Sequence, residues 1–163
     1  GESGLRKALE QRHFQLTDQQ PDYVVVGLDS QVTYAKLETA VLLIRAGATF
    51  IGTNADSNLP NERGMVPGAG SLVKLVEYAT QQKPIMIGKP EATIMKLALA
   101  KADLTRDQVV MVGDNYNTDI RAAINTGMDS LLVYTGLSTP EQVAKMAVQP
   151  THTVKSLDEW TID

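Results

Sequence analysis

The sequence contains no cysteine among its 163 residues. Disulfide bonds, thiolate metal ligands and a cysteine nucleophile are therefore excluded for this chain. Its apolar runs are also short, whereas a membrane-spanning helix needs about 20 predominantly apolar residues. The first residues lack the basic and apolar layout of a secretory signal. These absences predict a cytoplasmic protein with no membrane partner.

Positive charge is scarce as well. The chain has 15 Lys and Arg residues against 19 Asp and Glu residues, a net charge of −4, and no basic cluster. Because nucleic acid is bound by concentrated positive charge, we expect no nucleic-acid partner. The two histidines, His13 and His152, are far apart in the sequence and lack the spacing of metal ligands.

The chain does have enough apolar residues, 43%, to bury a core, and they alternate between strand and helix patterns. This alternation predicts an α/β fold with parallel strands and right-handed crossovers. Polar and Pro/Gly-rich residues at 55–67 predict an exposed loop. Residues 1–11 have helical spacing but no initiating Met, and we expect that something upstream has been removed. The predicted strands are 23–27, 49–54, 84–88, 108–112 and 130–134, and the main helices are 33–48, 68–81, 91–102 and 118–125.

The strongest chemical signal is the string VVMVGDNYNTD, which places Asp114 directly after a predicted strand and Asp119 five residues later. Ligands bind beyond the carboxyl ends of the strands in open parallel sheets. Two carboxylates at that edge suit Mg²⁺, which prefers oxygen ligands. The alternative is that Asp114 only caps a helix and that Asp119 lies favourably near the helix dipole.

Lys89 gives a second signal, at the end of predicted strand 84–88 and before Pro90. A lysine brought to the same sheet edge as Asp114 would supply positive charge for an anionic substrate or intermediate. Gly-Lys-Pro is a weak motif by itself, and a solvated surface lysine is the alternative. Its position one helix and one strand before Asp114 strengthens both signals.

Together, IGKP and VGDNYNTDI resemble motifs III and IV of the haloacid dehalogenase (HAD) superfamily of phosphatases. GTNADSNLPNERGMVPGAGSL and the closing SLDEW extend the resemblance to its NagD-like, 4-nitrophenylphosphatase-type branch. The resemblance implies a Rossmann-like parallel sheet, the HAD core, which is incomplete here, and an inserted α/β cap domain. Residues 1–84 would be the cap, incomplete at its N-terminus, and residues 85–163 the C-terminal part of the core.

The resemblance also implies residue roles. Asp114 would be the acidic Mg²⁺ ligand of motif IV, and Asp119 would orient the metal shell directly or through water. Lys89 would pair with the nucleophile and the transferring phosphoryl group. In the cap, the loop that contains Thr53, Asn54 and Asp56 would contact a small phosphorylated substrate.

The family's nucleophile motif is missing from these 163 residues. Its chemistry needs an aspartate that forms an aspartyl-phosphate and a second acid two residues later. No Asp-x-Asp occurs in the sequence. In GLDSQVT, Asp29 would be the nucleophile of a capless enzyme, with Thr53 binding phosphate, but Gln31 cannot act as the acid. We therefore expect a Mg²⁺-dependent phosphatase in the longer parent protein and an inactive fragment here.

Two alternatives from other classes stay open. One is a non-catalytic α/β module that binds an anion or a nucleotide at the same sheet edge. The other is a cap half that chiefly mediates contact between subunits of a homo-oligomer. The fold does not distinguish sugar phosphates, nucleotides and cofactor phosphates as substrates.

Overall fold

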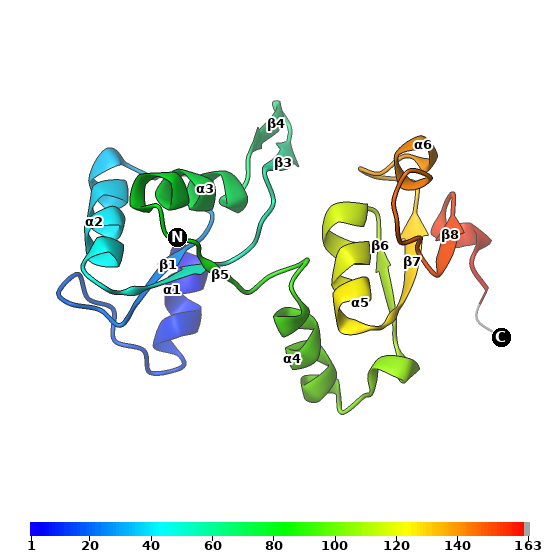
Figure 1. Ribbon diagram of the computed structural model, residues 1–163, viewed down its shortest axis with the longest axis horizontal. Helices are drawn as coiled ribbons and strands as arrows, with labels where there is room; N and C mark the ends of the chain where they lie inside the picture. The colour runs from blue at the N-terminus through cyan, green and yellow to red at the C-terminus, as the bar shows by residue number, and fades with distance from the viewer. Residues whose placement is uncertain (162–163) are drawn as a thin grey trace. The chain divides into compact units, whose positions relative to one another are not determined.

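The computed structural model describes residues 1–161 and divides the chain into two compact units, one ending at Gly88 and the other starting at Lys89. Each unit has its own three-stranded parallel sheet (Figure 1). The predicted α/β fold with parallel strands is confirmed. The division falls four residues after the boundary expected at residue 84, and the assignment of the units to cap and core stays a prediction.

In the first unit, the order of the parallel strands is β1-β2-β5. The helix after β1 begins where its sequence predicts, because the Thr33 hydroxyl accepts the Lys36 N–H as an N-cap. The elements are α1 (Ser3–Glu10), β1 (Tyr23–Val26), α2 (Tyr34–Arg45), β2 (Thr49–Gly52), α3 (Ala69–Thr80) and β5 (Ile85–Met86).

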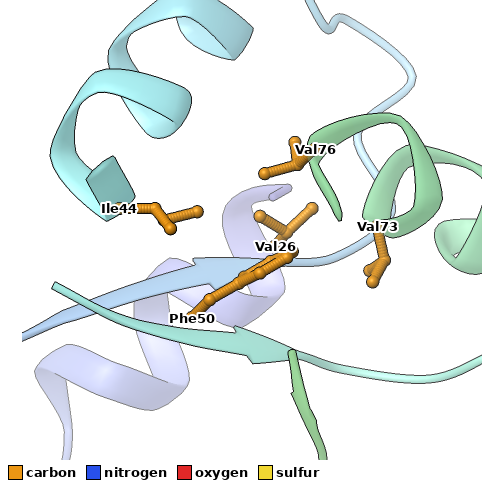
Figure 2. Close-up of a cluster of buried hydrophobic side chains, with 5 residues drawn as sticks. All are labelled: Val26, Ile44, Phe50, Val73 and Val76. Atoms are coloured by element: carbon orange, nitrogen blue, oxygen red, sulfur yellow. The ribbon is translucent and has the colours of Figure 1, made fainter. Parts of the chain in front are cut away.

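The core of this unit joins β1 and β2 to the two helices α2 and α3. Figure 2 shows the buried side chains that form it, which are Val26, Ile44, Phe50, Val73 and Val76. Ile44 and Val76 are fully buried. Burying an aliphatic or phenylalanine side chain stabilises a fold by about 1.5 to 3 kcal/mol, so this cluster fixes the βαβ arrangement.

Residues 55–67 are mostly exposed, as predicted, but they contain a β-hairpin, so the prediction of a loop was wrong for most of this segment. Strands β3 (Asn58–Asn61) and β4 (Gly64–Pro67) pair antiparallel. The strands were missed because Asn, Pro and Gly are poor strand formers. Gly64, at the start of β4, has φ of +120°, a conformation that favours glycine.

The second unit has parallel strands in the order β6-β7-β8. The helix predicted over 118–125 ends at Gly127, which adopts the left-handed conformation. The elements are α4 (Ala92–Ala102), η1 (Arg106–Gln108), β6 (Val110–Gly113), η2 (Tyr116–Ile120), α5 (Arg121–Thr126), β7 (Asp129–Val133), α6 (Pro140–Val143), β8 (His152–Val154) and η3 (Leu157–Glu159).

Strand β5 corrects one prediction about Lys89. We expected the strand before Lys89 to share a sheet edge with the strand before Asp114. Instead, β5 is two residues long, pairs with β2 in the first unit, and exposes Ile85. Lys89, which pairs with Asp119, therefore lies in the linker after β5.

Across residues 1–161, no helix has the length and apolar character needed to span a bilayer.

Candidate active site

The segment after β6 begins with Asp114 and turns at once into a π-helix, η2. The Asn115 side chain caps this helix by accepting the Asn117 N–H at 3.0 Å. Asp119 lies within the helix and is 5% exposed. Single π-turns are rare and occur often at functional sites, which makes this segment the first candidate for a site.

Both oxygens of the Asp119 carboxylate have partners. Oδ1 accepts a hydrogen bond from Lys89 Nζ at 2.6 Å, and Oδ2 accepts the Asn115 N–H at 3.2 Å. The Lys89 side chain is 45% exposed, so the ion pair is only half-buried on the side of the lysine. A buried carboxylate with a paired cation avoids the cost of an isolated charge. The pairing of Lys89 with Asp119 was not predicted from the sequence, and its expected pairing with a nucleophile and a phosphoryl group stays a prediction.

Gly113, the last residue of β6, leaves the room that Asp119 needs. A methyl group at this position would overlap the Asp119 side chain. The glycine of the Gly-Asp motif is therefore required by a close approach, because its φ is not positive.

Asp114 is held by backbone groups of the loop that follows β7. Its Oδ2 accepts the Leu137 N–H at 3.0 Å, and its main-chain carbonyl accepts the Ser138 N–H at 3.0 Å. In the part of the chain that the structure describes, Oδ1 of Asp114 accepts no hydrogen bond. The side chain is thus oriented through one oxygen and leaves the other free to bind a ligand.

The carboxylates of Asp114 and Asp119 are the candidate Mg²⁺ ligands of this segment. Mg²⁺ is usually held by one or two carboxylates, with waters and substrate phosphates as its other ligands. No cluster of three or more His, Cys, Asp or Glu side chains suited to a metal occurs within residues 1–161. Asp114, with one free carboxylate oxygen, fits one ligand of such a site. Both oxygens of Asp119 already have donors, so it fits less well as a direct ligand.

In the first unit, Thr53, Asn54 and Asp56 follow β2 in a well-defined turn. The Asn54 side chain accepts the Asp56 N–H at 3.3 Å, and the Asp56 carbonyl accepts the Gly70 N–H at 2.9 Å. A nearby cavity of 270 Å³ does not include these three residues in its lining, which is Ala55, Gly70, Val73, Lys74, Glu77, Lys83, Pro84 and Met86. Their contact with a substrate stays a prediction.

Asp29 has a structural environment in the first unit. It is 8% exposed, and its Oδ2 accepts a hydrogen bond from Lys36 Nζ at 3.0 Å. Its Oδ1 accepts the Gln31 N–H at 3.0 Å. Burial raises the pKa of Asp29, but the hydrogen bonds from Lys36 and Gln31 outweigh it and hold the pKa below its usual value. The carboxylate that sequence alone offered as a nucleophile is thus an ion-paired carboxylate after β1.

Asp29→Asn is expected to lower the free energy of unfolding by about 1.5 to 3 kcal/mol at pH 7, the range for a hydrogen bond to a charged group. A lowered folded-state pKa adds stability above the unfolded-state pKa, about 3.9, and this stability is lost as the pH falls through the lower folded-state value. The difference between wild type and variant should therefore shrink below about pH 4. Urea unfolding at several pH values measures it, with exposed Asp18→Asn as control. A difference that is constant with pH would contradict this account of Asp29.

Sequence reasoning missed Asn115, Leu137 and Ser138. All three donate a backbone N–H group to Asp114 or Asp119, and every residue type except proline carries such a group. The feature of the sequence that could have indicated Leu137 and Ser138 is the string TGLS, residues 135–138, which follows β7 at the same sheet edge as Asp114.

Nearly the whole chain is similar to known proteins. A family model described as HAD-hydrolase-like matches residues 86–160. The acid sugar phosphatase of Staphylococcus saprophyticus is 50% identical over 160 residues, which are 98% of this chain and 62% of the relative. The 5'-nucleotidase YutF of Bacillus subtilis is 45% identical over the same shares. The chain thus spans less than two thirds of the length of these relatives.

The fold of the chain is also similar to solved structures of phosphatases. A mutant of the thermostable NPPase of Geobacillus stearothermophilus is 47% identical with a TM-score of 0.93, over 99% of this chain and 64% of that one. NagD of Escherichia coli is 33% identical with a TM-score of 0.91, over 99% of this chain and 63% of that one. Residues 86–160 thus match the haloacid dehalogenase-like family, and the chain as a whole is similar to NagD and to a 4-nitrophenylphosphatase-type enzyme.

Proposed function

We propose that this chain supplies the lysine and metal-binding part of a Mg²⁺-dependent phosphomonoester hydrolase. The observation that carries the proposal is the ion pair between Lys89 and Asp119, because Asp119 lies five residues after Asp114, whose Oδ1 is free. The phosphatase and nucleotidase names of the relatives support the same reaction class.

Asp114 would bind the metal through Oδ1 while Leu137 holds Oδ2. Bound Mg²⁺ would offset the charge of the phosphate and of the carboxylates around it. Asp119 would act through its neighbours, because its two oxygens accept hydrogen bonds from Lys89 and Asn115. We therefore place Asp114 as a direct ligand and Asp119 as the residue that orients Lys89 and, through water, the metal shell.

Lys89 would place a fixed positive charge beside the transferring phosphoryl group. A preorganised cation stabilises the charge that develops in the transition state. The short ion pair with Asp119 limits the positions that the flexible lysine side chain can adopt. The side chain is 45% exposed, so it is not sealed within the core.

The nucleophile would come from residues outside these 163. The sequence has no Asp-x-Asp motif, and the relatives are longer than this chain. We propose that an aspartate there attacks phosphorus, the phosphorus–oxygen bond to the leaving group breaks, and a neighbouring acid protonates the leaving oxygen. Water then hydrolyses the aspartyl-phosphate.

Residues 1–84 would form the cap of the enzyme, and Thr53, Asn54 and Asp56 would contact a small phosphorylated substrate. A cytoplasmic location and a homo-oligomeric assembly stay predictions from the sequence. The substrate class includes sugar phosphates and nucleotides, the two groups that the names of the relatives suggest.

Hydrolysis of p-nitrophenyl phosphate in the presence of Mg²⁺ tests the proposal. The assay compares the 163-residue chain with the full-length protein as the gene encodes it. We expect EDTA-sensitive turnover by the full-length protein and turnover near background by the chain alone. Substantial turnover by the chain alone would contradict the placement of the nucleophile. A full-length protein inactive on p-nitrophenyl phosphate, sugar phosphates and nucleotides would contradict the phosphatase function.

A further inference from the structure

The loop of residues 135–138, which follows β7, contacts Asp114 on its main chain and on its side chain. The Leu137 N–H donates to Oδ2 of Asp114, and the Ser138 N–H donates to its main-chain carbonyl, both at 3.0 Å. Two consecutive backbone donors thus bind one aspartate. Such an arrangement limits both the backbone and the carboxylate orientation of Asp114.

Gly136 brings this loop close to the carboxylate. A methyl group at Gly136 would overlap the Cβ, Cγ and Oδ2 atoms of Asp114. Its φ is not positive, so the need for glycine arises from this approach and not from the backbone conformation. The loop therefore packs directly against the side chain that would bind the metal.

Ser138 connects the same loop to the π-helix. It is 8% exposed, and its Oγ accepts the Tyr116 N–H at 2.8 Å. Ser138 thus bonds to the residues before and after Asn115. Its N–H donates to the Asp114 carbonyl, and its hydroxyl accepts the Tyr116 N–H. A buried N–H without a partner is costly, so the hydroxyl adds a third hydrogen bond that keeps these two segments together.

The loop itself is anchored at its C-terminal end. Thr139 and Gln142 form a capping box at the start of α6. Val143 of α6 is buried in one cluster with Tyr116, whose hydroxyl donates to the Val148 carbonyl at 2.7 Å. The loop is thus held between β7 and α6, and its position is transmitted to Asp114.

We propose that Gly136, Leu137 and Ser138 form a positioning loop that fixes the Asp114 carboxylate so that Oδ1 faces the metal. This inference rests on the proposed function, in which Asp114 is the metal ligand. The three residues are positioning residues, because their contacts are with Asp114 and Tyr116. Groups that orient a metal ligand typically change metal affinity by about 10- to 100-fold when they are removed.

Mn²⁺ binding to the full-length protein, followed by electron paramagnetic resonance, tests the proposal with a readout other than activity. Gly136→Ala and Ser138→Ala are each expected to raise the Kd for Mn²⁺ by about tenfold or more. Thermal unfolding of each variant is measured alongside, so that loss of folding is separated from loss of affinity.

Two matched controls come from the same chain. Ser130 is a buried serine of β7, and its Oγ accepts the Thr151 N–H at 3.1 Å, away from Asp114. Ser130→Ala should lower the unfolding temperature as Ser138→Ala does but leave the Kd within about twofold, because it orients no ligand. Gly4→Ala, at a helical glycine with open space around it, controls for the glycine substitution.

The outcomes separate this proposal from the one on which it rests. If the wild type binds Mn²⁺ and Asp114→Asn abolishes binding, the metal site is supported. The positioning loop is overturned if folded Gly136→Ala and Ser138→Ala then keep the wild-type Kd. It is also overturned if Ser130→Ala weakens binding as much as Ser138→Ala. If the wild type shows no binding that depends on Asp114, the proposed metal site itself fails, and the positioning role fails with it.

Discussion

Asp114→Asn is expected to lower kcat/KM of the full-length protein for p-nitrophenyl phosphate by about a thousandfold or more. The metal supplies several kcal/mol of transition-state stabilisation, and each 1.36 kcal/mol corresponds to about a tenfold change in rate. Asparagine has nearly the same size and keeps an oxygen that can accept the Leu137 N–H. The substitution therefore removes the negative charge and leaves the packing in place.

Steady-state kinetics over a range of Mg²⁺ concentrations measures this effect. Asp107→Asn is the matched control, because Asp107 lies in the same unit and its side chain is 81% exposed. The control should keep its activity and its Mg²⁺ dependence. Wild-type kinetics in Asp114→Asn would exclude Asp114 as a metal ligand.

Lys89→Met should lower kcat by about 100- to 1,000-fold, the usual effect of removing one preorganised electrostatic group from a transition state. Methionine keeps most of the length of the side chain but neither binds Asp119 nor carries charge. The substitution also leaves the buried Asp119 carboxylate without its cation, so a fall in stability accompanies the loss of rate. Lys145→Met, at an exposed lysine of the same unit, is the control.

A double-mutant cycle with Asp119→Asn separates these two contributions. If Asp119 acts by orienting Lys89, Asp119→Asn should lower kcat much less in the Lys89→Met background than in the wild type. The reason is that the effects of substitutions at contacting residues are not additive. Unfolding experiments on the same four proteins give the stability part of the coupling. Fully additive losses of kcat would contradict a role of Asp119 through Lys89.

Much of the fold could be predicted because local signals and tertiary structure agree. The Thr33 N-cap, the Gly127 C-cap and the apolar run at β1 each mark an element that the structure contains. The helix predicted over 118–125 differs in one respect, because it begins as a π-helix at Tyr116. Periodicity gives no sign of that turn, which depends on the side chains of Asn115 and Asp119 bonding to nearby backbone N–H groups.

The sequence predicted those residues of the candidate site that act through their side chains, but not those that act through backbone groups. Lys89, Asp114 and Asp119 are residue types that suit the chemistry, and their spacing identifies them. Leu137 and Ser138 act on Asp114 through backbone N–H groups, which the sequence does not distinguish. The pairing of β5 with β2 was also unpredictable, since a two-residue strand carries almost no pattern of its own.

The most direct test of the account compares Asp29→Asn with Asp114→Asn in the full-length protein, measuring Mg²⁺-dependent hydrolysis of p-nitrophenyl phosphate at pH 7. Both carboxylates follow a parallel strand, but Asp29 is ion-paired to Lys36 while Asp114 has a free oxygen. We predict that Asp29→Asn keeps most of its activity and that Asp114→Asn loses about a thousandfold or more. An inactive but folded Asp29→Asn, together with an active Asp114→Asn, would contradict the account.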